Sequence, residues 1–174
     1  MIRKVVTYGN PVLRQRAKEV DVFDKALRAL ADDMLVSMYA ENGIGLAAPQ
    51  VGHSIRMMVI DTRDSEQKSL VLINPVIQLG AEKVISEEGC LSFPGIIFEV
   101  ERSQEIEVNA QDLEGKPMHF MAKDLLARVV QHELDHLNGI LFIDYLNIVQ
   151  KTLLSGKLKR LQKKTQAELS GIIL

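Results

Sequence analysis

Residues 124–138 read DLLARVVQHELDHLN, and this stretch predicts the helix around which the fold is built. Asp124 is a candidate cap for its N-terminus, and Asn138-Gly139 mark its end. His132 and His136 lie four residues apart within it. Residues with this spacing lie one turn above each other on the same helix face, so the two imidazoles can bind one metal ion.

The glutamate beside the first histidine gives the pentapeptide His132-Glu133-Leu134-Asp135-His136 its chemical character. In a helix with this pattern the glutamate lies at the open side of the metal, where it transfers protons rather than binding the ion. The alternative is a pair of buried structural histidines with Glu133 on the surface. The full pattern on a well-formed helix favours the metal site.

A catalytic zinc-type site needs three protein ligands and one position open to water, so a third ligand must come from elsewhere in the chain. No histidine follows residue 136, which excludes the metzincin continuation. The remaining candidates are two downstream carboxylates and three upstream side chains: Asp144, Glu168, Cys90, His53 and His119.

Cys90 is the only cysteine of the chain, so it cannot form an intramolecular disulfide. It follows Glu87-Glu88-Gly89, and two neighbouring acids oppose a free thiolate. A bound divalent cation reverses this effect, because it deprotonates the thiol. The sequence therefore favours Cys90 as a metal ligand over a catalytic nucleophile, and a small buried core residue is the remaining alternative.

Outside the 124–138 helix, the chain predicts a helix, then several strands, and finally another helix. Asp21 or Asp24 is expected to cap the first helix, and Gly115 suggests a hairpin turn. The predicted segments are a helix over about 24–40, strands over 55–61, 70–79, 84–94, 96–110 and 117–122, and a C-terminal helix over about 145–168. This order indicates an α+β fold, with antiparallel or mixed sheets packed around the central helix. We expect residues 1–174 to form a single domain, because the sequence shows no linker or repeat.

The composition is that of an ordinary globular protein, with 47% hydrophobic residues and a net charge of −2. No apolar run reaches the roughly 20 residues that cross a bilayer, and the N-terminus lacks a secretory signal pattern. We therefore expect a cytoplasmic protein that does not enter a membrane. Residues 157–164 are locally basic, which favours a solvated helix face over specific recognition of DNA or RNA.

With these features assembled, the chain resembles bacterial peptide deformylase, in the shorter form found in Gram-negative bacteria. The resemblance covers nearly the whole chain, including residues 10–14 and the C-terminal helix. It is carried by three motifs in order: Gly43-Ile44-Gly45-Leu46-Ala47-Ala48-Pro49-Gln50, Glu88-Gly89-Cys90-Leu91-Ser92 and Gln131-His132-Glu133-Leu134-Asp135-His136.

The resemblance implies a hydrolase that removes the formyl group from the N-terminal formyl-methionine of nascent polypeptides. Formate is released after attack by a metal-activated water. It also implies one Fe²⁺ per chain, for which Zn²⁺, Ni²⁺ or Co²⁺ can substitute. The implied roles are metal ligation by Cys90, His132 and His136, general acid–base catalysis by Glu133, and stabilisation of the developing oxyanion by the Gln50 side chain and the Leu91 N–H.

Substrate-binding residues are also implied by the resemblance. The glycines would let the peptide backbone approach, and the apolar groups, with the aliphatic part of the glutamate, would line a methionine pocket. These residues are Ile44, Gly45, Glu88, Gly89, Leu125 and Val129. Ser86 and Arg128 stand where some relatives carry apolar residues, and Ile97 stands where some carry an arginine. These three departures concern substrate preference rather than the chemistry.

Two further polar residues carry weaker hypotheses. Gln131 either supports the first metal ligand or lies on the helix surface. Arg102 is predicted to pair with Glu41 and brace the glycine loop, which comprises residues 43–52. By resemblance, the basic C-terminal helix could dock the enzyme at the ribosome, and a monomer is favoured.

Two other classes of protein remain open at this point. A zinc peptidase of the wider His-Glu-x-x-His group would share the activated water and the base, but it would not need a thiolate ligand. A metal-stabilised binding domain would need a fourth protein ligand in a closed site. The third ligand and the role of Glu133 distinguish these alternatives.

Overall fold

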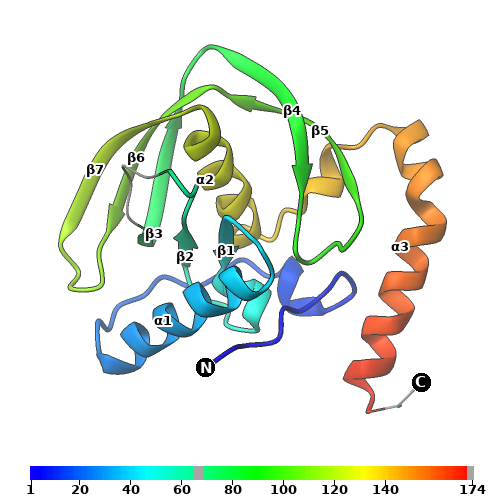
Figure 1. Cartoon of the computed structure of the whole chain (residues 1–174), viewed down its shortest axis with the longest axis horizontal. Coiled ribbons are helices and arrows are strands. Elements are labelled where there is room, and N and C mark those ends of the chain that lie inside the picture. The colour runs from blue at the N-terminus through cyan, green and yellow to red at the C-terminus, as the bar shows by residue number, and fades with distance from the viewer. Residues whose placement is uncertain (65–68, 172–174) are drawn as a thin grey trace.

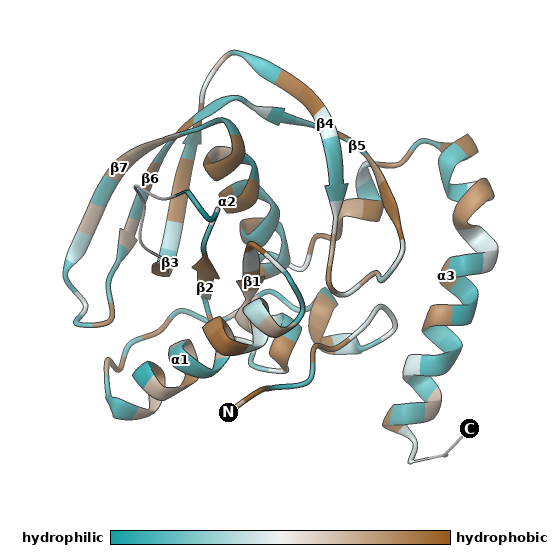
Figure 2. Cartoon of the chain, in the orientation of Figure 1, coloured by the Kyte–Doolittle hydropathy of each residue, from teal (hydrophilic) through white to brown (hydrophobic). Residues whose placement is uncertain are grey.

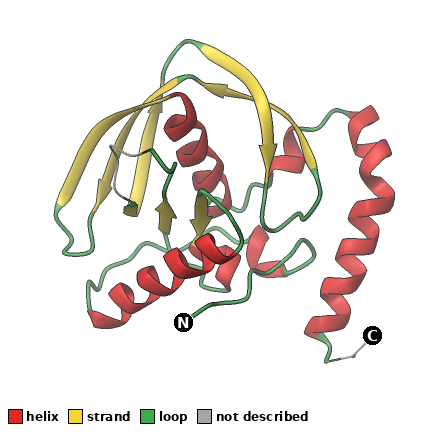
Figure 3. Ribbon diagram, in the orientation of Figure 1, coloured by secondary structure: helices red, strands yellow, loops and turns green. Residues whose placement is uncertain are grey.

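A five-stranded antiparallel sheet forms one side of the molecule. The computed structural model describes residues 1–64 and 69–171. In this sheet the strand order is β1-β2-β3-β6-β7, and each neighbouring pair is antiparallel. The strands are β1 (Gly45–Ala47), β2 (Met57–Ile60), β3 (Leu70–Leu79), β6 (Glu105–Gln111) and β7 (Pro117–Lys123). Together with the helices, this arrangement confirms the predicted α+β class (Figure 3).

A separate two-stranded sheet consists of β4 (Lys83–Gly89) and β5 (Ile97–Ser103). The prediction of one continuous strand over 96–110 was wrong, because the chain changes sheets at Gln104. Its N–H donates to Glu82 O at 2.9 Å, and its carbonyl accepts from Asp124 N–H at 2.8 Å. The predicted strand over 84–94 also ends early, since β4 stops at Gly89 and a turn follows.

The central helix α2 (Asp124–Leu137) lies between the two sheets (Figure 1). Asp124 is not its N-cap. It is the first helical residue, with a positive φ of 49°, and its carboxylate accepts from Gln104 Nε2 at 3.1 Å. The extended Lys123 precedes the helix without a side-chain cap. The predicted C-terminus is confirmed, with Asn138 as the C-cap.

The large sheet is covered on both faces, and β2 shows why. Its four residues are all buried and apolar, and Figure 2 colours the strand uniformly brown. Met58 and Ile60 pack into the cluster with α2, whereas Met57 and Val59 pack into the cluster with α1 (Lys25–Ala40). Alternate residues of a strand point to opposite faces, so two apolar layers require a continuously apolar strand.

Helix α1 begins after Asp24, whose side chain accepts from Leu27 N–H at 2.9 Å. This bond settles the choice between the two predicted caps. Helix α3 (Ile148–Leu169) is capped by Asn147 and lies at the outer side of the β4–β5 unit (Figure 1). Three short 3₁₀ segments complete the fold: η1 (Pro11–Arg14), η2 (Ala48–Val51) and η3 (Phe142–Tyr145). Across the described residues, none of the helices combines the length and apolar character needed to cross a membrane.

The turn that ends α2 gives a stability prediction. Gly139 has a φ of +74°, and a Cβ there would lie 2.7 Å from the Arg14 carbonyl oxygen. We expect Gly139→Ala to lower the free energy of unfolding by roughly 1–2 kcal/mol, because a side chain disfavours left-handed backbone. Urea unfolding midpoints measure the effect. Gly156→Ala is the control, since Gly156 lies within α3 with open space around it. It should stabilise the fold by roughly 0.4–1 kcal/mol, and equal effects would contradict the prediction.

Candidate metal centre and active site

Three potential metal ligands converge where α2 passes the end of β4. His132 and His136 come from successive turns of α2, and Cys90 comes from the turn after Gly89. One ligand atom from each of the three lies within 4.8 Å of the others. Cys90 Sγ is 3.2 Å from His136 Nε2. Among the described residues, this is the one group of three or more such side chains with metal-ligand spacing.

Glu88 fixes the orientation of the first histidine. Its Oε2 lies 2.9 Å from His132 Nδ1, and its carboxylate is also paired with Arg102. Burial alone would raise the pKa of Glu88, but the hydrogen bonds from His132 and Arg102 outweigh burial and lower it to about 2. An ionised Glu88 accepts a hydrogen bond from Nδ1, so Nε2 is the atom of His132 that can bind a metal. Burial lowers the pKa of His132, but its hydrogen bonds with Cys90 and Glu88 outweigh burial and raise the pKa well above the usual value, so a metal would bind Nε2 by displacing a proton.

The second histidine is buried at 1% exposure. Burial, together with the nearby His132 and Arg102, holds the pKa of His136 well below its usual value. A neutral imidazole is the form that binds metals. Its Nδ1 is fully buried and has no hydrogen-bond partner within the described part of the chain. One thiolate and two imidazoles match the donors that zinc and iron accept, so these residues fit a divalent transition metal.

The other candidate third ligands have partners elsewhere. Each makes an ion pair or hydrogen bond away from the 132–136 helix face. His53 contacts Arg3, and His119 pairs with Glu107. Asp144 pairs with Arg14, and Glu168 pairs with Lys4. Of the five candidates for the third metal ligand, the geometry therefore leaves Cys90.

Glu133 is 4% exposed and is directed at the same site. Burial, with a smaller contribution from Glu88, raises its pKa to about 7, although the charge of His132 opposes the shift. Oε2 of Glu133 is buried without a hydrogen-bond partner in the described residues. A Cβ at Gly45 would lie 2.5 Å from Oε1 of Glu133 and 2.7 Å from Cγ1 of Val129, so a side chain there would displace the carboxylate. The carboxylate can thus exchange a proton near pH 7, and it makes no ion pair with any of the described residues.

Gln50 presents its amide nitrogen to Cys90, one of the three potential metal ligands. It is 1% exposed, and its Oε1 accepts from Ala47 N–H at 2.8 Å. This bond fixes which end of the amide faces the site. Nε2 lies 3.6 Å from Cys90 Sγ and 3.3 Å from Ser92 Oγ. Leu91 follows Cys90 in the same turn and lines the same cavity.

A cavity of about 600 Å³ opens beside these groups. It is lined by Gln50, Leu91, Cys90, His132 and Glu133, and by all six residues that the resemblance implied for substrate binding: Ile44, Gly45, Glu88, Gly89, Leu125 and Val129. Ile97 and Arg128 also line it. Leu125 and Ile97 are exposed, at 37% and 64%, and so lie at the mouth rather than in the interior. Glu88 contributes only its aliphatic part, since its carboxylate is held by Arg102 and His132.

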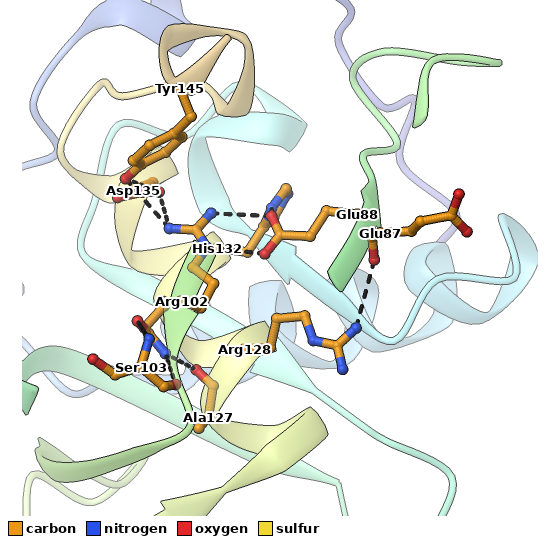
Figure 4. A network of polar contacts seen from close by, with 10 residues as sticks. Glu87, Glu88, Arg102, Ser103, Ala127, Arg128, His132, Asp135 and Tyr145 are labelled. Carbon is orange, nitrogen blue, oxygen red and sulfur yellow. Dashed lines mark hydrogen bonds and ion pairs between the residues drawn. The ribbon is translucent and has the colours of Figure 1, made fainter. Parts of the chain in front are cut away.

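Two hypotheses about polar residues were wrong. Arg102 does not pair with Glu41, because it is 6% exposed and binds Glu88 and Asp135 instead (Figure 4). Gln131 is neither a surface residue nor a partner of His132. Its side chain accepts from Ser103 N–H at 3.1 Å and donates to Ser103 O at 2.8 Å, which ties β5 to α2.

Sequence reasoning also missed Tyr145. It lies at the end of η3, where its hydroxyl donates to Asp135 at 2.8 Å and its ring lies 4.8 Å from the Arg102 guanidinium. The available signal was Asp135, which lies inside the motif but is not one of its expected metal ligands.

Comparison with known proteins agrees with this geometry. The sequence profile of the polypeptide deformylase family matches residues 2–152. The chain is 46% identical over 170 residues to the peptide deformylase of Bartonella henselae, covering 96% of this chain and 97% of that protein. It is 44% identical over 162 residues to the peptide deformylase of Desulfotalea psychrophila, covering 91% and 96% of the two chains.

Solved structures show the same likeness. A crystal structure of a peptide deformylase from Legionella pneumophila superposes with a TM-score of 0.87 at 41% identity, covering 96% of this chain and 98% of the other. A peptide deformylase from Arabidopsis thaliana, solved with an inhibitor, gives a TM-score of 0.90 at 40% identity, covering 97% and 94%.

Proposed function

The chain belongs to the polypeptide deformylase family, and from that premise we propose how its residues carry out the family's reaction. The enzyme removes the formyl group from the N-terminus of nascent polypeptides and releases formate. The observation that carries the assignment of roles is that Cys90, His132 and His136 lie at metal-ligand spacing, next to a buried Glu133 whose Oε2 has no hydrogen-bond partner in the described residues.

Cys90, His132 and His136 would hold the metal, one ion per chain. When bound, the metal supplies Lewis-acid activation of water and of the formyl oxygen. Glu88 keeps His132 in the tautomer whose Nε2 is free, and burial keeps His136 neutral. Glu133 is not counted among the ligands, so the site retains a position for water and substrate.

Glu133 is the proton carrier in this proposal. Its Oε2 has no partner in the described residues, and its pKa of about 7 allows it to take a proton and return it. It removes a proton from the attacking water and later delivers that proton to the leaving amine. The approach of Gly45 to Oε1 leaves no room for a side chain that would displace the carboxylate.

Gln50 and Leu91 would stabilise the oxyanion that develops on the formyl oxygen. Donors must be in place before the charge appears, so that no reorganisation is needed during the reaction. The contact of Gln50 Oε1 with Ala47 N–H provides this preorganisation, because it directs Nε2 toward the site. The Leu91 N–H would supply a second donor from the turn that carries Cys90.

The peptide would bind as an added strand between the glycine loop and the end of β4. Gly45 on β1 and Gly89 at the end of β4 both line the cavity, and glycines allow close approach of another backbone. The methionine side chain would lie against Ile44, Val129 and the stem of Glu88, with Leu125 at the rim. Arg128 can cover the apolar wall with its stem while its charge stays in water.

The substrate indicates where in the cell the enzyme works. Because nascent chains are made at ribosomes, we place the enzyme in the cytoplasm as a single domain of residues 1–174. A docking role for α3 at the ribosome rests on its basic residues over 157–164.

We propose Fe²⁺ as the metal in the cell. Affinity rises from iron to zinc along the Irving–Williams series, so identity is decided by geometry and supply. Protein purified without air is expected to contain one iron per chain and to release formate from formyl-Met-Ala-Ser. Exposure to air should then abolish activity, because ferrous iron and a thiolate are both oxidisable. Metal analysis and formate release are measured on the same sample.

Two results would contradict this proposal. Equal turnover by the iron and zinc forms, without loss in air, would refute iron as the working metal. Cleavage of internal peptide bonds without release of formate would instead favour the zinc peptidase.

A further inference from the structure

Arg102 is a buried cation that the reaction itself does not use. It lies on β5, is 6% exposed, and binds two carboxylates from different elements. Its Nε and Nη2 donate to Oε1 and Oε2 of Glu88 at 2.9 and 3.0 Å, and its Nη1 donates to Asp135 Oδ2 at 2.6 Å. Figure 4 shows the guanidinium between the two acids.

Stability alone does not explain this cluster. Removing three charges from water costs several kcal/mol per ion, and a well-packed apolar cluster often stabilises a fold as well or better. Such a group is better explained by a need for defined geometry. The geometry here is tightly defined, because the bidentate fork fixes the plane of the Glu88 carboxylate.

One oxygen of Glu88 connects the cluster to the metal centre. Oε2 accepts from Arg102 Nη2 at 3.0 Å and lies 2.9 Å from His132 Nδ1. The guanidinium thus sets the direction from which the carboxylate meets the imidazole. This contact decides both the tautomer of His132 and the direction in which its Nε2 points.

The outer end of the cluster is Tyr145. Its hydroxyl donates to the same Asp135 oxygen that binds Arg102, and its ring lies over the guanidinium. Tyr145 is 48% exposed, so it covers the buried ion pairs from the solvent side. It lies in η3, three residues before α3 begins, so the position of this segment is linked to the metal ligand through four side chains.

We propose that Arg102, Asp135 and Tyr145 are positioning residues for the metal centre, which act through Glu88 to orient His132. Asp135 thereby gains a role within the 132–136 pentapeptide, as the anchor that holds Arg102 to α2. The inference rests on the proposed ligand set of Cys90, His132 and His136. It concerns the affinity and geometry of that site rather than the steps of the reaction.

The test measures cobalt(II) binding to metal-free protein, without any assay of activity. Thiolate-to-cobalt absorption reports binding, and the visible bands of the bound ion report its ligand geometry. Arg102→Lys keeps the charge but loses the fork, and it is expected to weaken cobalt binding roughly 10–100-fold. Tyr145→Phe keeps the ring and loses one hydroxyl, and a rise in Kd of roughly tenfold or less is expected, with shifted visible bands.

The chain offers matched controls for both variants. Arg28 pairs with Glu114, and the Tyr39 hydroxyl donates to Asp61 at 2.6 Å, both at exposed positions outside η3. Arg28→Lys and Tyr39→Phe should leave the cobalt Kd and spectrum unchanged. Because Arg102→Lys leaves buried acids less well paired and can fail to fold, Tyr145→Phe is the deciding variant.

The outcomes separate two possible failures. If the wild-type protein binds no cobalt with a thiolate band, the ligand set is wrong. If it binds cobalt and Tyr145→Phe matches Tyr39→Phe in Kd and spectrum, the positioning role is refuted.

Discussion

Replacing Glu133 by glutamine is expected to lower kcat/KM for formyl-Met-Ala-Ser by about 10²–10⁴. The amide has almost the shape of the carboxylate but cannot accept a proton from water. The side chain is 4% exposed and its Oε2 has no partner in the described residues, so the change removes no ion pair. Steady-state rates of formate release measure the effect.

The same variant separates a catalytic metal site from a structural one. Cys90, His132 and His136 are unchanged by the substitution, so metal content and the unfolding temperature should stay close to those of the wild type. Glu99→Gln, an exposed change on β5, is the control and should retain full activity. Loss of metal from Glu133→Gln or Glu133→Ala would mean that Glu133 is a ligand, and the proposed proton transfer would then be wrong.

The sequence predicts the metal and base of this site because they depend on local spacing. His132 and His136 need only a helix, and the helix is signalled by its own apolar positions and its Asn138-Gly139 end. The cap was misplaced because Asp124 contacts Gln104, a residue 20 positions away at the corner between two sheets. Periodicity within a segment carries no information about such a contact.

Arg102 illustrates the same limit within the site. Its partners lie 14, 33 and 43 residues away, on β4, α2 and η3. The opposite charge of Glu41 made it a plausible partner in sequence, but the positions of the sheets decide which acid the guanidinium meets. The predicted 96–110 strand is likewise divided at Gln104, where the chain passes from the two-stranded sheet to the five-stranded one, and periodicity within the segment does not indicate this change.

Gln131 belongs to the motif around His132, but its contacts differ from the predicted ones. It precedes the first histidine and was considered as support for that ligand. Its amide instead pairs with both backbone groups of Ser103, the residue after Arg102, and with the Ala127 carbonyl at 3.0 Å. It therefore secures the end of β5 from which Arg102 reaches Glu88. The proximity of Gln131 to His132 in sequence gave no sign of this.

Replacing Cys90 by serine is expected to remove the metal and abolish activity. A change outside the ligand shell typically costs 10–100-fold in affinity, so loss of the thiolate itself should cost more than roughly 100-fold. Gln50 Nε2 lies 3.6 Å from the sulfur, so the same change also alters the surroundings of the proposed oxyanion donor. Metal analysis after gel filtration and formate release measure the two effects.

Because Cys90 is the only cysteine, its reactivity reports the site directly in the wild-type protein. Metal-free enzyme should react with one equivalent of a thiol reagent, since Cys90 lies at the wall of an open cavity. Bound metal should protect it, because a coordinated thiolate is a poor nucleophile, and a chelator should restore the reaction. Equal reaction rates with and without metal would show that the sulfur is not a ligand. The two histidines would then need a third partner that the described residues do not supply at this spacing.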